Sequence, residues 1–297
     1  MDNFLKNMTI NVIFFLLNKM FYPKIIILGP GGMKGIMELG ALQKLHEKGY
    51  LNNIERFVGC SIGSIISLLY ICGYLPYELL LKTKEHYNLL QFLPEHMTIK
   101  EYLNTGGIIQ TEKIKETLNI LVLNKLGSIP TLSQLKVMRN ISLTVVYSNI
   151  ETCKYGYISD ETHPDMLCTD AAIIGINIPG LISSGYFNGI DYTDGALTNP
   201  YPINIYDDGK TNILGIFIQQ TYDVNNFFER SMFIYVNMTI ASLRNFIIQH
   251  ASNKCKHLEI KTNIQDPTGI FICHDERENM YSSGYEVCDK FLKKMSE

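Results

Sequence analysis

The sequence predicts an α/β protein in which helices cover a largely parallel β-sheet. Two consecutive units of strand, glycine-containing loop and helix carry this prediction. The first unit joins an apolar strand at 24–28 to a helix at 36–48, and the second joins a strand at 52–58 to a helix at 61–73. Alternation of this kind is typical of parallel sheets. We therefore expect both loops at the carboxyl edge of the sheet, where ligand sites of such folds form.

The later elements follow from apolar periodicity and from glycine or proline breaks. Expected helices cover 76–90, 111–126, 165–177, 225–248 and 281–293, and expected strands cover 141–147, 155–159, 186–192, 213–218 and 257–264. No repeat, low-complexity tract or linker divides the chain, so we expect one domain over 1–297. The segment 225–248 has apolar residues on several faces, which favours a core helix over a helix that lines a groove for an apolar ligand or contacts a membrane.

Composition favours a globular protein of a reducing compartment and argues against a nucleic-acid-binding protein. The chain is 46% hydrophobic with a net charge of −3, which favours a globular protein and gives no basic stripe for nucleic acid. Seven scattered cysteines indicate free thiols in a reducing compartment. The apolar run at 10–17 is too short to span a bilayer and has no cleavage site, so 1–22 favours an amphipathic helix over a signal peptide or anchor. We expect a cytoplasmic protein, and any association with membranes is expected to be peripheral.

A nucleophile elbow is predicted at Gly59-Cys60-Ser61-Ile62-Gly63, where a strand leads into a helix. In such an elbow the serine hydroxyl is presented at the sharp turn, and Gly59 and Gly63 leave room where side chains would collide. The following helix offers N–H groups and a positive dipole end to developing negative charge. The alternative is an ordinary serine N-cap.

The loop Gly29-Pro30-Gly31-Gly32-Met33-Lys34-Gly35 fits neither nucleotide motif. A P-loop needs its lysine after the second required glycine, and the dinucleotide fingerprint needs glycine where Lys34 stands. The third interpretation is a loop whose backbone N–H groups stabilise an oxyanion, and a nucleophile at Ser61 would need such a loop. Lys34 either adds positive charge to this loop or is a solvated lysine at the start of a helix.

Four landmarks in this order resemble those of the patatin-like phospholipases: Gly31-Gly32-Met33-Lys34-Gly35, Gly59-Cys60-Ser61-Ile62-Gly63, Ile178-Pro179-Gly180-Leu181 and Asp194-Gly195-Ala196. The likeness covers about 24–202, and 203–297 is expected to complete the fold. It implies a three-layer α/β/α architecture and a Ser–Asp dyad that needs neither histidine nor metal. It also implies Ser61 as nucleophile, Asp194 as acid of the dyad, and Gly31, Gly32 and Met33 as the oxyanion hole. Pro30 departs from the family's usual glycine.

Asp194 can act as the base if its pKa is raised, and Gly195 allows the backbone to turn the carboxylate toward the serine. Asp191 is the competing aspartate, and Asp-Gly alone also fits a hairpin turn. His250, His257 and His274 follow Asp194, so a Ser, Asp, His triad remains open from the order of residues.

We therefore expect a serine lipid acyl hydrolase of the phospholipase A type, acting on phospholipid or another acyl lipid at a membrane or micelle surface. We expect no cofactor, no metal and no nucleic-acid partner. The alternatives are an acyltransferase and a lipid-binding protein of the same fold without turnover, the latter prompted by Pro30.

Overall fold

The computed structural model describes residues 21–85, 94, 96, 98–178, 180–183, 185–187, 189–221, 231–264 and 272–296. Its sheet consists of β1 (Ile25–Leu28), β2 (Arg56–Cys60), β3 (Ser142–Asn149), β4 (Lys154–Ser159), β5 (Gly185–Phe187), β6 (Ile190–Asp194), β7 (Ile213–Gln220) and β8 (Cys255–Thr262). The helices are α2 (Ile36–Glu47), α3 (Ile62–Cys72), α4 (Pro76–Glu85), α5 (Ile99–Thr105), α6 (Thr111–Leu126), α7 (Leu132–Arg139), α8 (Cys168–Ile174), α9 (Ser231–His250) and α10 (His274–Ser296), with 3₁₀ turns η1 (Gly32–Gly35), η3 (Gly195–Leu197) and η4 (Pro202–Ile205).

The expected mostly parallel sheet is confirmed. Its strand order is β5-β6-β3-β2-β1-β7-β8, with β4 also paired to β3. Strands β1, β2, β3, β7 and β8 are parallel, whereas β4, β5 and β6 pair antiparallel. The β-branched and apolar residues of β1 and β7 are buried, as is typical of central strands covered on both faces.

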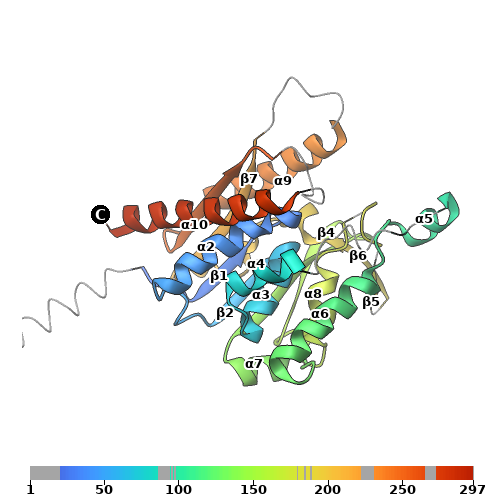
Figure 1. The fold of residues 1–297 in the computed structure, drawn as a ribbon, viewed down its shortest axis with the longest axis horizontal. Coiled ribbons are helices and arrows are strands. Elements are labelled where there is room, and N and C mark those ends of the chain that lie inside the picture. The colour runs from blue at the N-terminus through green and yellow to red at the C-terminus, as the bar shows by residue number, and fades with distance from the viewer. Residues whose placement is uncertain are drawn as a thin grey trace, which may run out of the picture.

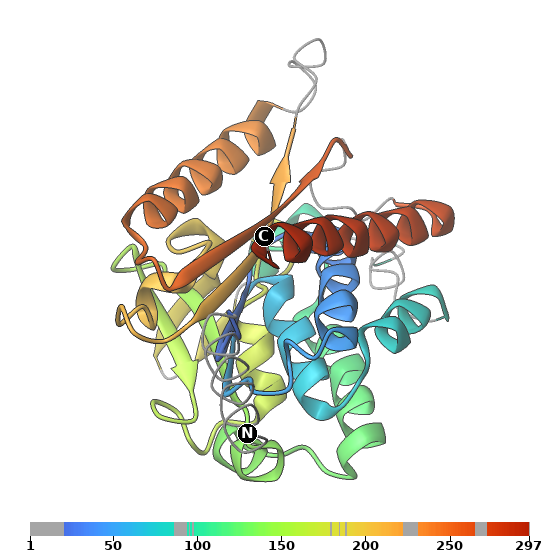
Figure 2. The same cartoon turned by 90° about the vertical axis from the view of Figure 1, so that its left-hand side faces the viewer.

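Helices lie on both faces of the sheet, as expected. Alternate residues of β1 divide between two cores: Ile26 and Leu28 join a large core with α2, α3 and α10, while Ile25 and Ile27 join a smaller one with η4 and the end of α9. Figure 1 shows the crowded helical layer, and Figure 2 shows α9 and α10 on opposite sides of β7 and β8. The face of the sheet that carries α2, α3 and α10 therefore buries a larger core than the face that carries η4 and α9.

Several expected element bounds differ from the observed ones. Strand β2 begins at Arg56 rather than at residue 52, and helix α8 covers only 168–174 of the expected 165–177. The expected strand at 186–192 is the hairpin β5–β6, and α10 begins at His274 rather than at residue 281. Helices α5 and α7 were not expected. The expected elements at 1–22, 86–90 and 225–230 lie wholly or mainly outside the described residues.

The last third of the chain contacts the first through α10. A β-carbon on Gly40 would overlap the Tyr281 backbone, and one on Gly284 would overlap Met37, so α2 and α10 approach closely where both lack side chains. This packing is consistent with one domain over 1–297, which stays a prediction.

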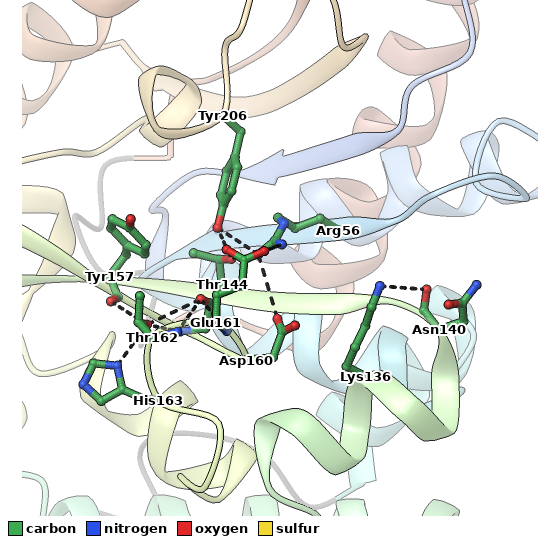
Figure 3. Close-up of polar contacts among 11 residues, drawn as sticks. Arg56, Lys136, Asn140, Thr144, Tyr157, Asp160, Glu161, Thr162, His163 and Tyr206 are labelled. Atoms are coloured by element: carbon green, nitrogen blue, oxygen red, sulfur yellow. Dashed lines mark hydrogen bonds and ion pairs between the residues drawn. The ribbon is translucent and has the colours of Figure 1, made fainter.

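Arg56 links three segments at the amino end of β2, on the opposite edge of the sheet from the loop after β2. Its guanidinium donates hydrogen bonds to Thr144 Oγ1 (3.0 Å), Tyr206 Oη (2.8 Å) and Glu161 Oε1 (2.5 Å), as Figure 3 shows. Its side chain is only 12% exposed, whereas Glu161 is 58% exposed. A second ion pair joins Arg56 to Asp160 Oδ1 at 3.9 Å, and both of these side chains are largely buried. The arginine therefore supports the fold more through its buried partners than through the exposed Glu161.

Arg56→Ala is expected to lower the free energy of unfolding by about 2 kcal/mol, because the hydroxyls of Thr144 and Tyr206 lose a charged donor. Urea denaturation measures this change. Lys24→Ala removes an exposed ion pair to Glu55 and serves as the control, with an expected change within about 0.5 kcal/mol. Equal effects of the two variants would contradict the importance of the buried hydrogen bonds.

Candidate active site

Ser61 occupies the strained turn expected of a nucleophile elbow. It lies between β2 and α3 with φ 55° and ψ −128°, a backbone conformation that costs a non-glycine residue about 1–3 kcal/mol. Side chains on the flanking glycines would not fit, because a β-carbon on Gly59 would overlap Ser64 and one on Gly63 would overlap the Leu28 carbonyl. The elbow thus packs directly against the end of β1. Cys60 is buried beside it, and burial raises the pKa of its thiol well above the usual value.

The register of β3 brings Asp194 to Ser61. On β3, Val146 pairs with Cys60 of β2, and the next residue, Tyr147, pairs with Asp194 of β6. Strand β4 pairs along Thr144–Asn149, so β2 and β6 must share the other edge of β3. Strand β6 therefore continues that edge where β2 turns into α3. The nucleophile elbow and the end of β6 meet at this point.

Asp194 is buried, and its carboxyl group interacts with the Ser61 side chain. Only 3% of the residue is exposed, and its Oδ1 accepts a hydrogen bond from the Ala196 N–H at 2.8 Å. Burial raises the pKa of the Asp194 carboxyl to about 6, against the lowering effects of its hydrogen bonds with Ser61 and Ala196. A β-carbon on Gly195 would lie 2.5 Å from the Val146 carbonyl oxygen, so the turn after Asp194 needs glycine. Asp191, the competing aspartate, is exposed.

The glycine loop lies beside the elbow. Gly31 and Gly35 make close approaches: a β-carbon on Gly31 would be 2.7 Å from Ile218 Cδ1, and one on Gly35 would be 2.9 Å from Ile62 Cγ1. The Lys34 N–H donates to the Gly31 carbonyl at 3.1 Å and forms the first hydrogen bond of η1. The N–H groups of Gly32 and Met33 precede that bond and have no partner within the helix.

Lys34 is not a solvated lysine. Only 4% of the residue is exposed, and its Nζ donates to Gln220 Oε1 at 2.8 Å, at the end of β7. The charged group therefore lies inside the protein next to the glycine loop. Of the two sequence interpretations, the structure favours added positive charge at this edge of the sheet.

Glu38 was missed by the sequence analysis. It is fully buried on α2, and its Oε1 accepts a hydrogen bond from the Gly29 N–H (3.1 Å), at the beginning of the glycine loop. No hydrogen-bond partner of its Oε2 is found among the described residues, and burial raises the pKa of the carboxyl well above its usual value. A buried carboxyl group thus connects the first residue of the loop to the helix that follows it.

The described histidines contact other groups. His257 Nδ1 lies 3.1 Å from Tyr201 Oη, and His250 Nδ1 lies 2.7 Å from the Phe246 carbonyl oxygen. The side chain of His274 lies outside the described residues. The hydrogen bonds that affect the Asp194 carboxyl come from Ser61 and Ala196. The Ser–Asp dyad stays a prediction.

Comparison with known proteins agrees with this architecture. The family model described as patatin-like phospholipase matches residues 26–207. A protein of Invertebrate iridescent virus 6, named probable lipid hydrolase 463L, is 32% identical over 185 residues, which are 62% of this chain and 63% of that protein. The uncharacterized protein R571 of Acanthamoeba polyphaga mimivirus is 24% identical over 78% of this chain and 80% of its own length.

Two solved structures are similar in fold. VipD from Legionella pneumophila superposes with a TM-score of 0.62 at 14% identity, covering 92% of this chain and 67% of that one. The type III effector protein ExoU gives a TM-score of 0.52 at 13% identity, covering 93% of this chain and 53% of that one. The fold is therefore a patatin-like α/β fold. The match over 26–207 shows further that this chain belongs to the patatin-like phospholipase family.

Proposed function

We propose that this protein is a serine lipid acyl hydrolase of the phospholipase A type, with Ser61 as nucleophile and Asp194 as general base. The observation that carries the proposal is that Ser61, on its strained elbow, interacts with a buried aspartate whose pKa is raised to about 6. A base with a pKa near neutrality can take the serine proton as the ester is attacked, because serine alone is a weak nucleophile. Family membership and the likeness to a viral protein named probable lipid hydrolase support it.

In the first half-reaction, Ser61 Oγ bonds to the ester carbonyl carbon while its proton passes to Asp194. The backbone N–H groups of Gly31, Gly32 and Met33 stabilise the tetrahedral oxyanion, and Lys34 adds positive charge nearby. Pro30 has no N–H, which is why we assign the oxyanion hole to the residues after it. When the ester C–O bond breaks, Asp194 returns its proton to the leaving alcohol. The acyl group remains on Ser61.

In the second half-reaction, Asp194 takes a proton from water as the water oxygen attacks the acyl carbon. The bond to Ser61 Oγ then breaks, and the proton on Asp194 passes to Oγ. The fatty acid is released and both groups return to their starting states. Gly35, Gly59, Gly63 and Gly195 support this geometry through the close approaches already described.

We propose acyl lipids at a membrane or micelle surface as the substrates. Large apolar side chains on one helix, α9, are exposed and suit contact with lipid: Tyr235, Val236, Met238 and Phe246. No helix within the described residues has the length and apolar character needed to cross a bilayer. Peripheral action from the cytoplasm is the location we propose.

A fluorophosphonate probe followed by intact mass spectrometry tests the proposal. A serine hydrolase should gain one covalent adduct, and peptide mapping should place it on Ser61. Ser61→Ala should gain none, while Ser67→Ala, which changes a buried serine on the same helix, should be labelled like the parent protein. An unlabelled parent would favour a lipid-binding protein without turnover, and an adduct elsewhere would contradict the elbow assignment.

The pH dependence follows from the raised pKa of Asp194. The base must be ionised to accept the serine proton, so kcat/KM should fall about tenfold per pH unit below about pH 6 and level off above it. Initial rates on a neutral soluble ester between pH 4 and 8 measure this. A descent that begins near pH 4 would mean that the base has an ordinary carboxyl pKa.

Hydrolysis is expected to continue without metal, because backbone N–H groups rather than a cation receive the oxyanion in this mechanism. Among the described residues, no three His, Cys, Asp or Glu side chains are grouped to hold an ion. The assay uses a short-chain soluble ester with EDTA, so that calcium-dependent adsorption to lipid does not enter. Activity lost with EDTA and restored by calcium would show that the site has been misread.

A further inference from the structure

An apolar cavity of about 140 Å³ adjoins the candidate active site. Its wall includes Gly32 and Met33 of the glycine loop and Ile62, the residue after Ser61. Ser61 itself does not line the cavity, so the cavity begins beside the glycine loop and one residue away from the proposed nucleophile. It extends from there into the helical layer formed by α2, α3, α4 and α6, which Figure 1 shows on one side of the sheet.

Each of these helices contributes apolar side chains at helical spacing. Helix α3 contributes the stripe Ile62, Ile65, Ile66 and Leu69, and α6 contributes Ile114, Leu118 and Leu121. Ile62 and Ile65 are only half-buried although they lie on a helix between the sheet and other helices. The polar residues of the lining are few: Lys82, Thr83 and Thr117. A chain of methylene groups fits this lining, whereas a phosphate or glycerol group would lose its hydrogen bonds there.

We propose that this cavity binds the acyl chain of the substrate and sets a preference for medium chains. This inference rests on the proposed hydrolase function and adds the part of the substrate that enters the helical layer. A cavity of about 150 Å³ lined by apolar residues holds benzene, so the present one has room for about six carbon atoms. With one or two carbons between it and the ester carbonyl, chains of about eight carbons fill it. The proposal excludes α9 as the wall of the acyl site, because α9 does not line this cavity.

The first test measures kcat/KM for p-nitrophenyl esters from two to twelve carbons, below their aggregation limits. Each added methylene should raise kcat/KM about fourfold, which corresponds to about 0.8 kcal/mol per buried CH₂. The increase should end near eight carbons. A parallel series of acetate esters with lengthening alkyl alcohols should show no such increase. If the alcohol series rises and the acyl series does not, the cavity holds the leaving group and the proposal is wrong.

Two variants change the cavity in opposite directions. Thr117→Phe should fill it and end the increase near four carbons, and Leu118→Ala should enlarge it and move the end of the increase about two carbons longer. Ile120→Phe is the matched control for the first, because Ile120 is exposed on the same helix. Leu135→Ala is the control for the second, because Leu135 is equally buried but does not line the cavity. Chain-length profiles that are the same in all four proteins would overturn the proposal.

A binding measurement separates this proposal from the hydrolase proposal. Ser61→Ala cannot form the acyl-enzyme, so calorimetry can follow methyl octanoate and methyl acetate without turnover. We expect methyl octanoate to bind at least tenfold more tightly, and Thr117→Phe in this background to abolish the difference. If the parent protein hydrolyses no ester but this preference is found, the hydrolase proposal fails and the cavity proposal stands. Equal binding of the two esters would reject the cavity as the acyl site.

Discussion

Asp194→Asn is expected to lower kcat/KM by about 10²–10⁴-fold, the usual contribution of a general base. The amide has nearly the volume of the carboxyl group and its oxygen can still accept the Ala196 N–H. It cannot take the proton of Ser61. Steady-state kinetics on a soluble ester at pH 8 measures the loss, and the fluorophosphonate adduct should form correspondingly more slowly.

The stability of Asp194→Asn should be unchanged or increased, although its activity is lost. The folded pKa of Asp194 is raised above the ordinary value of 3.8 to about 6, so the folded state binds a proton more tightly than the unfolded state. Such a group favours folding progressively as pH falls from about 6 toward 4, and it disfavours folding above pH 6. Asparagine removes the cost of a buried charge. At pH 8 the variant should therefore be at least as stable as the parent protein in urea.

Histidine variants provide the control for the dyad. His250→Ala, His257→Ala and His274→Ala should each retain most of the activity, because the described contacts of the Asp194 carboxyl group are to Ser61 and Ala196. His257 contacts Tyr201 on the far side of β7 from the glycine loop, and its loss should affect mainly stability. A folded histidine variant as impaired as Asp194→Asn would replace the dyad with a triad.

Local chemistry explains why the elbow could be predicted from the sequence. Gly59 and Gly63 are required by contacts within a few residues and with the adjoining strand, and the strand and helix on either side have clear apolar patterns. Two helices that were not expected also had a readable local signal. Thr98 with Glu101 and Thr131 with Gln134 form capping boxes at the starts of α5 and α7.

The position of Asp194 depends on contacts that are distant in sequence. One strand was expected at 186–192, whereas the segment forms the β5–β6 hairpin, whose strand β6 pairs with β3 and places Asp194 beside the end of β2. No local pattern specifies that register, and the role proposed for Asp194 was suggested by the family resemblance. The burial of Lys34 likewise depends on Gln220, which is 186 residues away.

The sequence also contains a signal for the burial of Glu38. It shares a helical stripe with Leu42 and Leu45, at spacings of i+4 and i+7, and both leucines are fully buried. A charged residue on an apolar stripe is uncommon without a specific partner. Here the partner is the backbone N–H of Gly29, which becomes visible only once β1, the glycine loop and α2 are placed together.

Ser61→Gly is expected to abolish turnover and yet to be more stable than Ser61→Ala. Both variants lack the hydroxyl, so no acyl-enzyme forms, and the loss relative to the parent should exceed about 10⁴-fold. Their backbones differ. Residue 61 has φ 55° and ψ −128°, a conformation that strains alanine but not glycine.

Because both variants also lose the interaction of the serine hydroxyl with Asp194, the difference between their stabilities isolates the strain of the elbow. The free energy of unfolding of Ser61→Gly should exceed that of Ser61→Ala by about 1 kcal/mol, after the greater backbone entropy of unfolded glycine is subtracted. Urea denaturation at pH 8 measures both. Asn140, which also has a positive φ (54°), provides the comparison outside the site, and Asn140→Gly should likewise be more stable than Asn140→Ala. The contradicting outcome is that Ser61→Ala and Ser61→Gly have the same free energy of unfolding while Asn140→Ala and Asn140→Gly differ. In that case the backbone at residue 61 is not strained in solution, and the interpretation of this turn as a strained elbow is wrong.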